Sequence, residues 1–307
     1  MFSIITPVFN GEDFIEETIQ SVFRHAPSED FEYLIINDGS TDATPRILEK
    51  FTDSVTILSQ SNQGEAASVN NALAMATGKY ALVVSADDPL LSPQLFSLSR
   101  EILEEYEDVI VTYPDWFLIN ESGEIVKQVV TPEYSTYELV GLNKCLPGPG
   151  AIFRIESALA IGGRNRNLRF GSDYEFWLRM SNLGKFKRIP NVLAQWRSHA
   201  NSTSIKSRGE EMARERIQII EDFIAESDLT SDIKRVALAN AYYSAAILRY
   251  FSKSVPHRKY LRKAFVIRRG FVENARLVEL IYLLLIPVSE TVWKFAKRFL
   301  RITLKRL

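Results

Sequence analysis

The chain has 307 residues, 46% of them hydrophobic and 24% charged, a composition typical of globular proteins rather than disordered or fibrous ones. This length can bury a sizeable core and fits one large domain or two ordinary ones. The single cysteine, Cys145, excludes a framework of intramolecular disulfides and is typical of a reducing compartment.

Charge is unevenly distributed along the chain. Residues 258–307 carry thirteen Lys or Arg against three Glu, a balance of +10, and the rest therefore carries −11. This asymmetry indicates that one end meets an anionic surface. The chain enters a strand at Phe2, so we expect no signal peptide, and the longest apolar run, 280–288, is too short to span a bilayer. We therefore expect a cytoplasmic protein.

Strands and helices alternate through the first quarter of the chain. Apolar runs predict strands over 2–8, 31–36, 55–58 and 80–84. Helical spacing predicts helices over 13–25, 45–51 and 65–76. This alternation favours an α/β fold with a mostly parallel, Rossmann-like sheet, whose ligands bind beyond the carboxyl ends of the strands.

Three of these strand ends are polar: Pro7–Asn10, Asn37–Ser40 and Ser85–Asp88. None carries the glycine pattern of a dinucleotide or P-loop site. Asp87 and Asp88 are adjacent like charges at the end of a buried strand, which predicts a cation nearby. Carboxylates suit Mg²⁺ or Mn²⁺, ions that neutralise a diphosphate, but they are equally typical of turns and helix caps.

The middle of the chain is less regular. A strand is predicted over Val109–Asp115, then a turn at Asn120–Gly123 and a returning strand over Glu124–Val130. The segment Leu146–Arg154 contains two Gly and two Pro, which suits either the close approach of a bulky ligand to the backbone or a rigid corner. Three arginines in Arg164–Arg169 could face a phosphate or lie in a solvated loop.

Only helices are predicted beyond residue 206, over 210–226, 231–251, 258–267 and 291–307, which gives a domain of residues 1–205 and a helical region of 206–307. The last helix sets apolar residues against six Lys or Arg, a pattern typical of a helix in an anionic membrane interface. A helix that binds a protein partner or forms a homo-oligomer is the alternative. No base-reading motif accompanies the charge, so we do not expect nucleic-acid binding.

Six segments, in this order, resemble motifs of family 2 glycosyltransferases with the GT-A fold. They are Ser3–Asn10, Asn37–Asp42, Asn62–Gly64, Ala86–Asp88, Gly171–Arg179 and Arg197–His199. The resemblance covers roughly the first two-thirds of the chain. It implies a GT-A sheet flanked by helices, a nucleotide-sugar donor and a divalent metal ion, Mn²⁺ or Mg²⁺.

The resemblance also implies roles for individual residues. Asp38 is similar to the carboxylate that binds the nucleobase, and Asp87 to the one that binds the ribose. Asp88 is similar to the metal ligand, and His199 either completes the metal shell or faces the diphosphate. The full set of implied nucleotide-sugar contacts is Pro7, Phe9, Asn10, Asp38, Asn62, Gly64, Asn70 and Asp87. A helix cap is the alternative for Asp38.

The chain departs from the family pattern at two positions. Ser85 stands where members often carry a further Asp, which shortens the acidic motif. Val69 stands where many members carry a basic residue, so Asn70 and the metal would cover more of the phosphate charge.

Asp173 is the implied catalytic base. Direct displacement at an anomeric carbon needs a base for the proton of the incoming hydroxyl, and a carboxylate in a partly dry cleft can accept it. The family's usual pair here is Glu-Asp, and this chain has Ser172-Asp173. Glu175 could support the base or contact the acceptor. A cap on the predicted helix 174–180 is the alternative for Asp173.

Together these patterns predict an inverting, metal-dependent glycosyltransferase that moves one sugar from a UDP-sugar to a glycan or lipid-linked acceptor. The setting would be cell-surface polysaccharide synthesis at the inner face of the plasma membrane. Trp196 and Arg197 differ from the Gln-x-x-Arg-Trp signature of processive synthases, which favours single transfers. A non-catalytic nucleotide-sugar-binding or scaffold protein and a nucleotidyltransferase are the alternatives.

Overall fold

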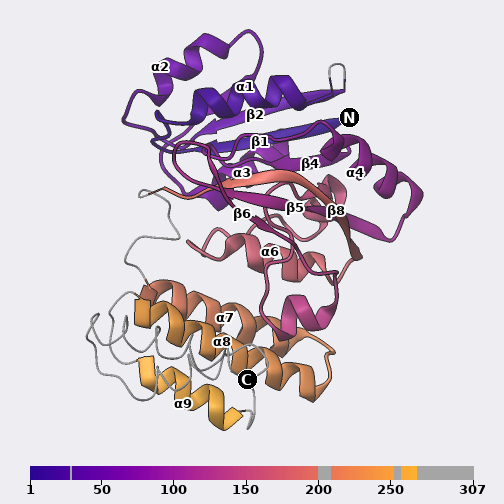
Figure 1. The fold of residues 1–307 in the computed structure, drawn as a ribbon, viewed down its shortest axis with the longest axis vertical. Coiled ribbons are helices and arrows are strands. Elements are labelled where there is room, and N and C mark those ends of the chain that lie inside the picture. Colours follow the sequence, from indigo (N-terminus) through magenta and orange to yellow (C-terminus); the bar gives the residue numbers. More distant parts are fainter. Residues whose placement is uncertain (28–29, 200–208, 252–256, 268–307) are drawn as a thin grey trace, which may run out of the picture. The chain divides into compact units, whose positions relative to one another are not determined.

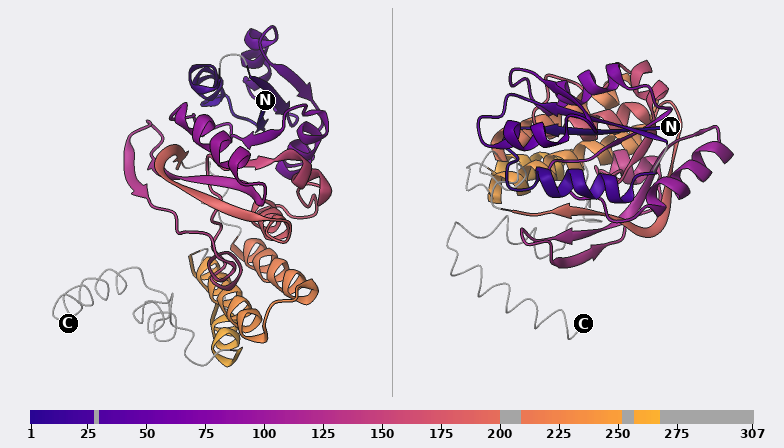
Figure 2. Two further views of the ribbon diagram at one scale, coloured as in Figure 1. Left: turned by 90° about the vertical axis from the view of Figure 1, so that its right-hand side faces the viewer. Right: turned by 90° about the horizontal axis from the view of Figure 1, so that it is seen from above.

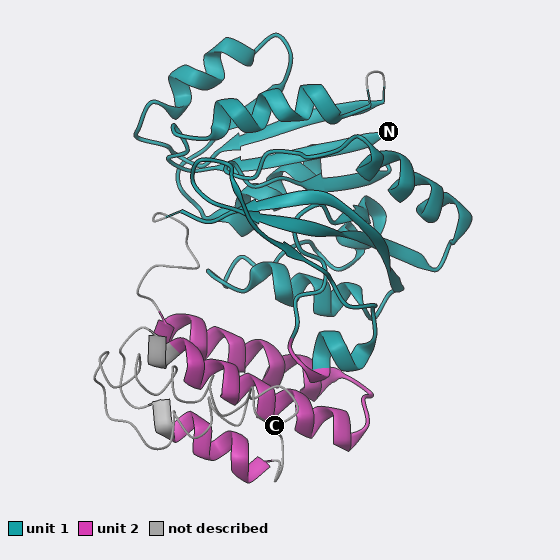
Figure 3. Cartoon of the chain, in the orientation of Figure 1, with its two compact units in different colours: residues 1–140, 144–206 teal, residues 141–143, 207–307 magenta. Residues whose placement is uncertain are grey.

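The computed structural model describes residues 1–27, 30–199, 209–251 and 257–267. The chain forms two compact units (Figure 3). The N-terminal unit comprises residues 1–140 and 144–206, and the C-terminal unit comprises 141–143 and 207–307.

The N-terminal unit is built on one sheet of eight strands (Figure 1). Their order is β3-β2-β1-β4-β7-β5-β6, and β8 pairs with β5. The strands are β1 (Phe2–Val8), β2 (Phe31–Asn37), β3 (Thr56–Ser59), β4 (Tyr80–Val83), β5 (Val109–Ile119), β6 (Ile125–Val129), β7 (Ile152–Arg154) and β8 (Lys185–Arg197). Strands β1 to β4 run parallel to their neighbours in that group, as do β5 and β8, whereas β6 and β7 are antiparallel to their partners. The mostly parallel α/β fold is confirmed.

Helices pack on both faces of this sheet (Figures 1 and 2). They are α1 (Ile15–His25), α2 (Thr44–Leu48), the short η1 (Glu49–Phe51), α3 (Glu65–Met75), α4 (Gln94–Glu105), α5 (Ile155–Ala160) and α6 (Ser172–Met180). A π-helical turn, η2 (Tyr137–Gly141), follows β6 in the chain. Helix α4 was not predicted, although buried Leu95, Phe96 and Leu103 lie at helical spacing on one face.

The strand register brings the polar strand ends together. Val8 of β1 is opposite Asn37 of β2, which is in turn opposite Ser59 of β3. On the other side of β1, Ile5 is opposite Val83, the last residue of β4. Ile4 and Ile5 inside β1 are fully buried, whereas Pro7 near the end of β1 is half-buried and Ser59 at the end of β3 is exposed.

A buried ion pair connects β5 to β8. Arg188 donates to both oxygens of Asp115, at 3.0 and 2.7 Å, and Thr131 donates to the same carboxylate. Burial alone would raise the pKa of Asp115, but the hydrogen bonds from Arg188 and Thr131 bring it below its ordinary value. This ion pair holds β8 against β5, and β8 ends at Arg197 at the polar carboxyl edge of the sheet.

The C-terminal unit contains α7 (Gly209–Glu226), α8 (Ser231–Phe251) and α9 (His257–Ile267), as the sequence predicts. Asn240 of α8 donates to the carbonyl of Gly141 at 2.9 Å, which ties residues 141–143 to this unit. Among the described residues, no helix is both long enough and apolar enough to cross a bilayer. The predicted membrane-binding helix 291–307 lies outside the described residues.

Candidate active site

Asp38, just beyond β2, organises the loop before α3. Its carboxylate is 3% exposed and accepts hydrogen bonds from the backbone N–H groups of Gln63 and Gly64 and from the side chain of Gln60, each at 2.8 Å. Asp38 does not cap α2, because Ala43 is the residue before that helix and the first helical N–H, of Thr44, donates to Asp42. Asp38 instead holds the 60–64 loop against the end of β2.

Asn10 ties the end of β1 to the end of β2. Its backbone is in the left-handed region (φ 52°), which asparagine tolerates better than most residues. Its side-chain oxygen accepts a hydrogen bond from Thr41 N at 2.8 Å, and its own N–H donates to Ser40. Phe9, 50% exposed, presents its ring at this edge beside half-buried Pro7.

The two adjacent carboxylates after β4 have different surroundings. Asp87 is 28% exposed, and its Oδ2 lies 2.9 Å from Nε2 of His199. Asp88 is only 6% exposed, and its Oδ1 accepts a hydrogen bond from the backbone N–H of Arg197 at 2.7 Å. Burial and the neighbouring Asp87 charge raise the pKa of Asp88 well above its ordinary value. Asp87 is therefore the carboxylate that faces solvent and the histidine.

Arg197, at the end of β8, holds this acidic segment in place. The side chain is 2% exposed, and its Nε donates to the carbonyl of Asp87 at 2.9 Å. Its two terminal nitrogens donate to the Glu121 carbonyl at 2.8 Å and to the Glu17 carboxylate at 2.7 Å. The guanidinium also lies 4.9 Å from the ring centre of Phe14. The sequence indicated Arg197 only as part of a motif, and this positioning role was missed.

Replacing Arg197 with lysine should lower the free energy of unfolding by about 2–3 kcal/mol. A lysine keeps the charge but cannot direct three nitrogens toward Asp87, Glu121 and Glu17 at once. Urea denaturation followed by circular dichroism measures the loss. The control is Arg214→Lys, because Arg214 is exposed and, within the part of the chain that the structure describes, forms an ion pair only with Glu210 on its own helix. We therefore expect a change below about 0.5 kcal/mol. Equal stabilities of the two variants would contradict the positioning role.

Asn70 differs from its predicted role. Its side-chain oxygen accepts from Arg164 N, and its side-chain nitrogen donates to Arg164 O, both at 2.7 Å. Arg164 is buried and pairs with Glu65 at 2.6 Å. The structure therefore places Asn70 as a clamp between α3 and the 161–166 segment, and we no longer assign it to a phosphate. Arg164 therefore has a structural role and does not lie in a solvated loop.

Asp173 lies in the first turn of α6. The helix begins at Ser172 after Gly171, so Asp173 is not its N-cap residue, but the exposed carboxylate does accept a hydrogen bond from the first-turn N–H of Tyr174 at 2.7 Å. The positive end of the helix dipole favours the ionised form of a carboxylate at this position. Glu175 instead makes a two-pronged ion pair with Arg179, at 2.6 and 2.7 Å.

The acidic edge offers a divalent ion few protein ligands. Within the described residues, no group of three or more His, Cys, Asp or Glu side chains is placed to hold a metal ion. Asp87 and His199 nevertheless form a carboxylate–imidazole pair at 2.9 Å. Mg²⁺ and similar hard ions commonly take one or two protein ligands and complete their shell with substrate phosphates and water. The pair fits an ion that is bound together with a diphosphate.

Comparison with known proteins identifies the family. Residues 3–156, half of the chain, match the sequence model of Glycosyl transferase family 2. The chain belongs to this family of glycosyltransferases. Its match to the hyaluronan synthase of Pasteurella multocida is 27% identical over 213 residues, which is 68% of this chain but only 22% of that protein. An uncharacterized glycosyltransferase of Haemophilus influenzae is 29% identical over 222 residues, 66% of this chain and 67% of that protein.

Solved structures confirm the GT-A fold of this glycosyltransferase. S. aureus TarS 1-349 in complex with UDP-GlcNAc has a TM-score of 0.68 at 20% identity, covering 92% of this chain and 83% of that one. The mannosyltransferase PcManGT from Pyrobaculum calidifontis, in complex with GDP-Man and Mn²⁺, has a TM-score of 0.60 at 16% identity, covering 88% and 81%. At these identities the likeness concerns the fold.

Proposed function

We propose that this family 2 glycosyltransferase transfers a single sugar from a UDP-sugar to a glycan or lipid-linked acceptor, with inversion and with a divalent metal ion. The observation that carries the proposal is the Asp87–His199 pair, 2.9 Å apart, at the same carboxyl edge of the sheet as the Asp38 loop. TarS with UDP-GlcNAc and the hyaluronan and chondroitin synthases support a UDP-sugar donor in polysaccharide synthesis.

The donor would lie across the ends of β1, β2 and β4. The nucleobase would contact Asp38 and the segment 7–10, with the backbone of Asn62 and Gly64 closing the site. Asp87 and His199 would hold the metal ion, which supplies positive charge against the diphosphate. We assign Asp88 to the loop rather than to the metal, because its side chain is only 6% exposed and its Oδ1 accepts a hydrogen bond from Arg197 N.

Asp173 would act as the base. Its carboxylate accepts the proton of the acceptor hydroxyl while that oxygen forms a bond to the anomeric carbon. The bond from the anomeric carbon to the phosphate oxygen breaks at the opposite face, and UDP leaves with the electron pair. A single displacement of this kind inverts the anomeric configuration, and it requires a base that is ionised beforehand. The first-turn position of Asp173 favours that form.

The cellular setting belongs to the same proposal. The positive balance of residues 258–307 supports a position at the inner face of the plasma membrane, where anionic lipids attract basic segments. A lipid-linked acceptor would be present at that surface.

A nucleotide-sugar panel tests the function. UDP-sugars with Mn²⁺ should raise the melting temperature of the protein more than GDP- or dTDP-sugars, and chelation of the metal should remove the shift. With the stabilising donor and a glycan acceptor, the protein should release UDP and form a product of inverted anomeric configuration, visible by NMR. Stabilisation without UDP release for any acceptor would favour the non-catalytic alternative. Stabilisation by GDP-sugars alone would overturn the donor assignment.

A further inference from the structure

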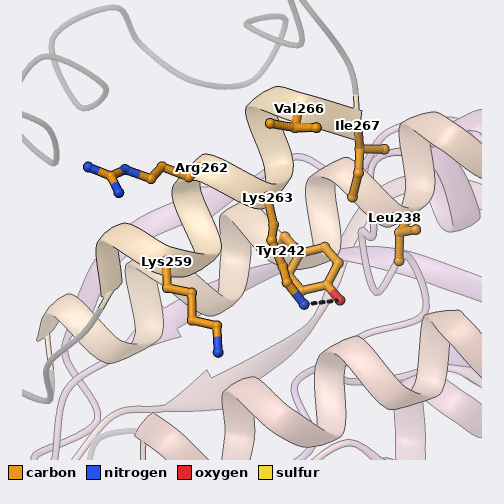
Figure 4. A pocket seen from close by; sticks show the side chains of 7 residues that line it. All are labelled: Leu238, Tyr242, Lys259, Arg262, Lys263, Val266 and Ile267. Carbon is orange, nitrogen blue, oxygen red and sulfur yellow. Dashed lines mark hydrogen bonds between the residues drawn. The ribbon is translucent and has the colours of Figure 1, made fainter.

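A second candidate site lies in the C-terminal unit, whereas the residues assigned to transfer belong to the N-terminal unit. Helices α8 and α9 border a cavity of about 650 Å³ (Figure 4). We call it the basic groove. Its cations are Lys259, Arg262 and Lys263, and its apolar side chains include Leu238, Val266 and Ile267.

The cations come from successive turns of one helix face. Residues 259, 262, 263 and 266 follow the spacing that places side chains on one side of a helix. Helix α9 carries four Lys or Arg and no acidic residue. Lys259 and Arg262 are exposed and make no ion pair with any residue that the structure describes. The charge on this face is therefore available to an anion.

Lys263 is held over the aromatic floor of the groove. Its ammonium lies 4.9 Å from the ring centre of Tyr242 and 3.4 Å from the hydroxyl (Figure 4). The hydroxyl donates to Glu221 of α7 at 3.0 Å. Burial and this carboxylate raise the pKa of Tyr242 to about 12, so the phenol stays neutral and adds no negative charge.

The groove continues into exposed apolar surface. On the packed side of α9, Leu261 and Ala264 are buried, whereas Val266 is 80% exposed and Phe265 is 55% exposed. Figure 4 shows Val266 and Ile267 at one end of the groove and Lys259 toward the other. A cationic end followed by an apolar end is complementary to an amphiphile with an anionic head.

We propose that the basic groove binds an anionic phospholipid of a membrane surface. Lys259, Arg262 and Lys263 contact the phosphate head, and Val266, Ile267 and Leu238 contact the beginning of the acyl chains. The apolar end favours a lipid over a nucleic acid, whose backbone offers no such surface. The site rests on the membrane position in the proposed function and names the residues that would contact the lipid, but it does not depend on the transfer reaction.

The charge test uses the full chain and vesicles. The double variant Lys259→Gln/Arg262→Gln should bind vesicles of phosphatidylglycerol and phosphatidylcholine about 30-fold more weakly than wild type, from about 1 kcal/mol for each cation. The control, Arg214→Gln/Arg235→Gln, removes the same charge from helices of the same unit, where both arginines pair with acidic residues. Its binding should change less than about 3-fold. Co-sedimentation at low ionic strength measures all three proteins.

The apolar test leaves the charge unchanged. Val266→Ser should weaken vesicle binding about 10-fold, because an apolar side chain no longer enters the acyl region. Val130→Ser, at a position 64% exposed in the N-terminal unit, should bind like wild type.

Equal losses of vesicle binding in the two double variants would mean that net charge alone attracts the protein and would overturn the site. Undiminished binding of the Lys259→Gln/Arg262→Gln and Val266→Ser variants would also overturn it. A change in sedimenting mass of these variants without lipid would assign the groove to a second copy of the chain, and RNA bound in place of vesicles would assign it to nucleic acid.

Discussion

Replacing Asp173 with asparagine should lower the turnover of sugar transfer by about 10²–10⁴-fold while leaving the fold and the donor affinity in place. Asparagine cannot accept the proton of the acceptor hydroxyl at neutral pH. It does keep a side-chain oxygen that can accept the hydrogen bond from Tyr174 N, which Asp173 accepts at 2.7 Å. The side chain is exposed, so the substitution leaves no buried group without a partner.

Three measurements separate chemistry from structure in this variant. UDP release with a saturating acceptor gives the turnover, calorimetry gives the donor affinity, and thermal denaturation gives the stability. The control is Asp53→Asn, which removes the same charge from an exposed turn before β3 and should leave all three values unchanged. Turnover of the Asp173→Asn protein near the wild-type value would remove Asp173 from the mechanism. Loss of stability together with turnover would instead indicate a structural role in α6.

The strands that position the candidate active site could be predicted because each is indicated by a short run of neighbouring residues. The run Tyr80–Val83 is continuously apolar or β-favouring, Phe2–Val8 is mostly so, and each stops at a polar segment. Parallel pairing then requires those ends to share one edge of the sheet. The six motifs in order predicted the family for the same reason, since each is a short segment at a strand end or a helix start.

The contacts of single side chains were less predictable, because their partners lie far along the chain. Asn70 is bound to Arg164, 94 positions away, and Asp88 to Arg197, 109 positions away. No spacing within the sequence indicates such pairs. Asp87 and Asp88 are alike as neighbours in sequence, and only the packing of β8 makes one of them exposed and the other buried.

The helical region shows the same division between local and long-range information. Periodicity predicted α7, α8 and α9, and composition indicated the excess of positive charge. The basic groove depends on which face of α9 packs against α8, a choice made by buried Leu261 and Ala264. From the sequence, binding to an anionic membrane surface was assigned to residues 291–307. The proposed lipid-binding groove lies instead on α9, within the described residues.

Because Asp87 and Asp88 have different surroundings, replacing each with asparagine should have different effects on UDP affinity and on stability. Asp87→Asn should weaken the Mn²⁺-dependent affinity for UDP by about 100-fold, because it removes the charge that faces His199. Asp88→Asn should leave that affinity within a few-fold, because an asparagine oxygen can still accept from Arg197 N. The same change should raise the free energy of unfolding of the metal-free protein by about 1 kcal/mol, since it removes a buried carboxylate whose charged form Asp87 disfavours.

Calorimetric titration of UDP with and without Mn²⁺ decides between the two carboxylates. The roles first inferred from the sequence gave the ribose to Asp87 and the metal to Asp88, and they predict that Asp88→Asn loses the metal dependence. The structure predicts that Asp87→Asn loses it, and that the two variants differ in stability because one carboxylate is buried and the other is not. A metal-dependent affinity that survives in Asp87→Asn and disappears in Asp88→Asn would restore the first assignment.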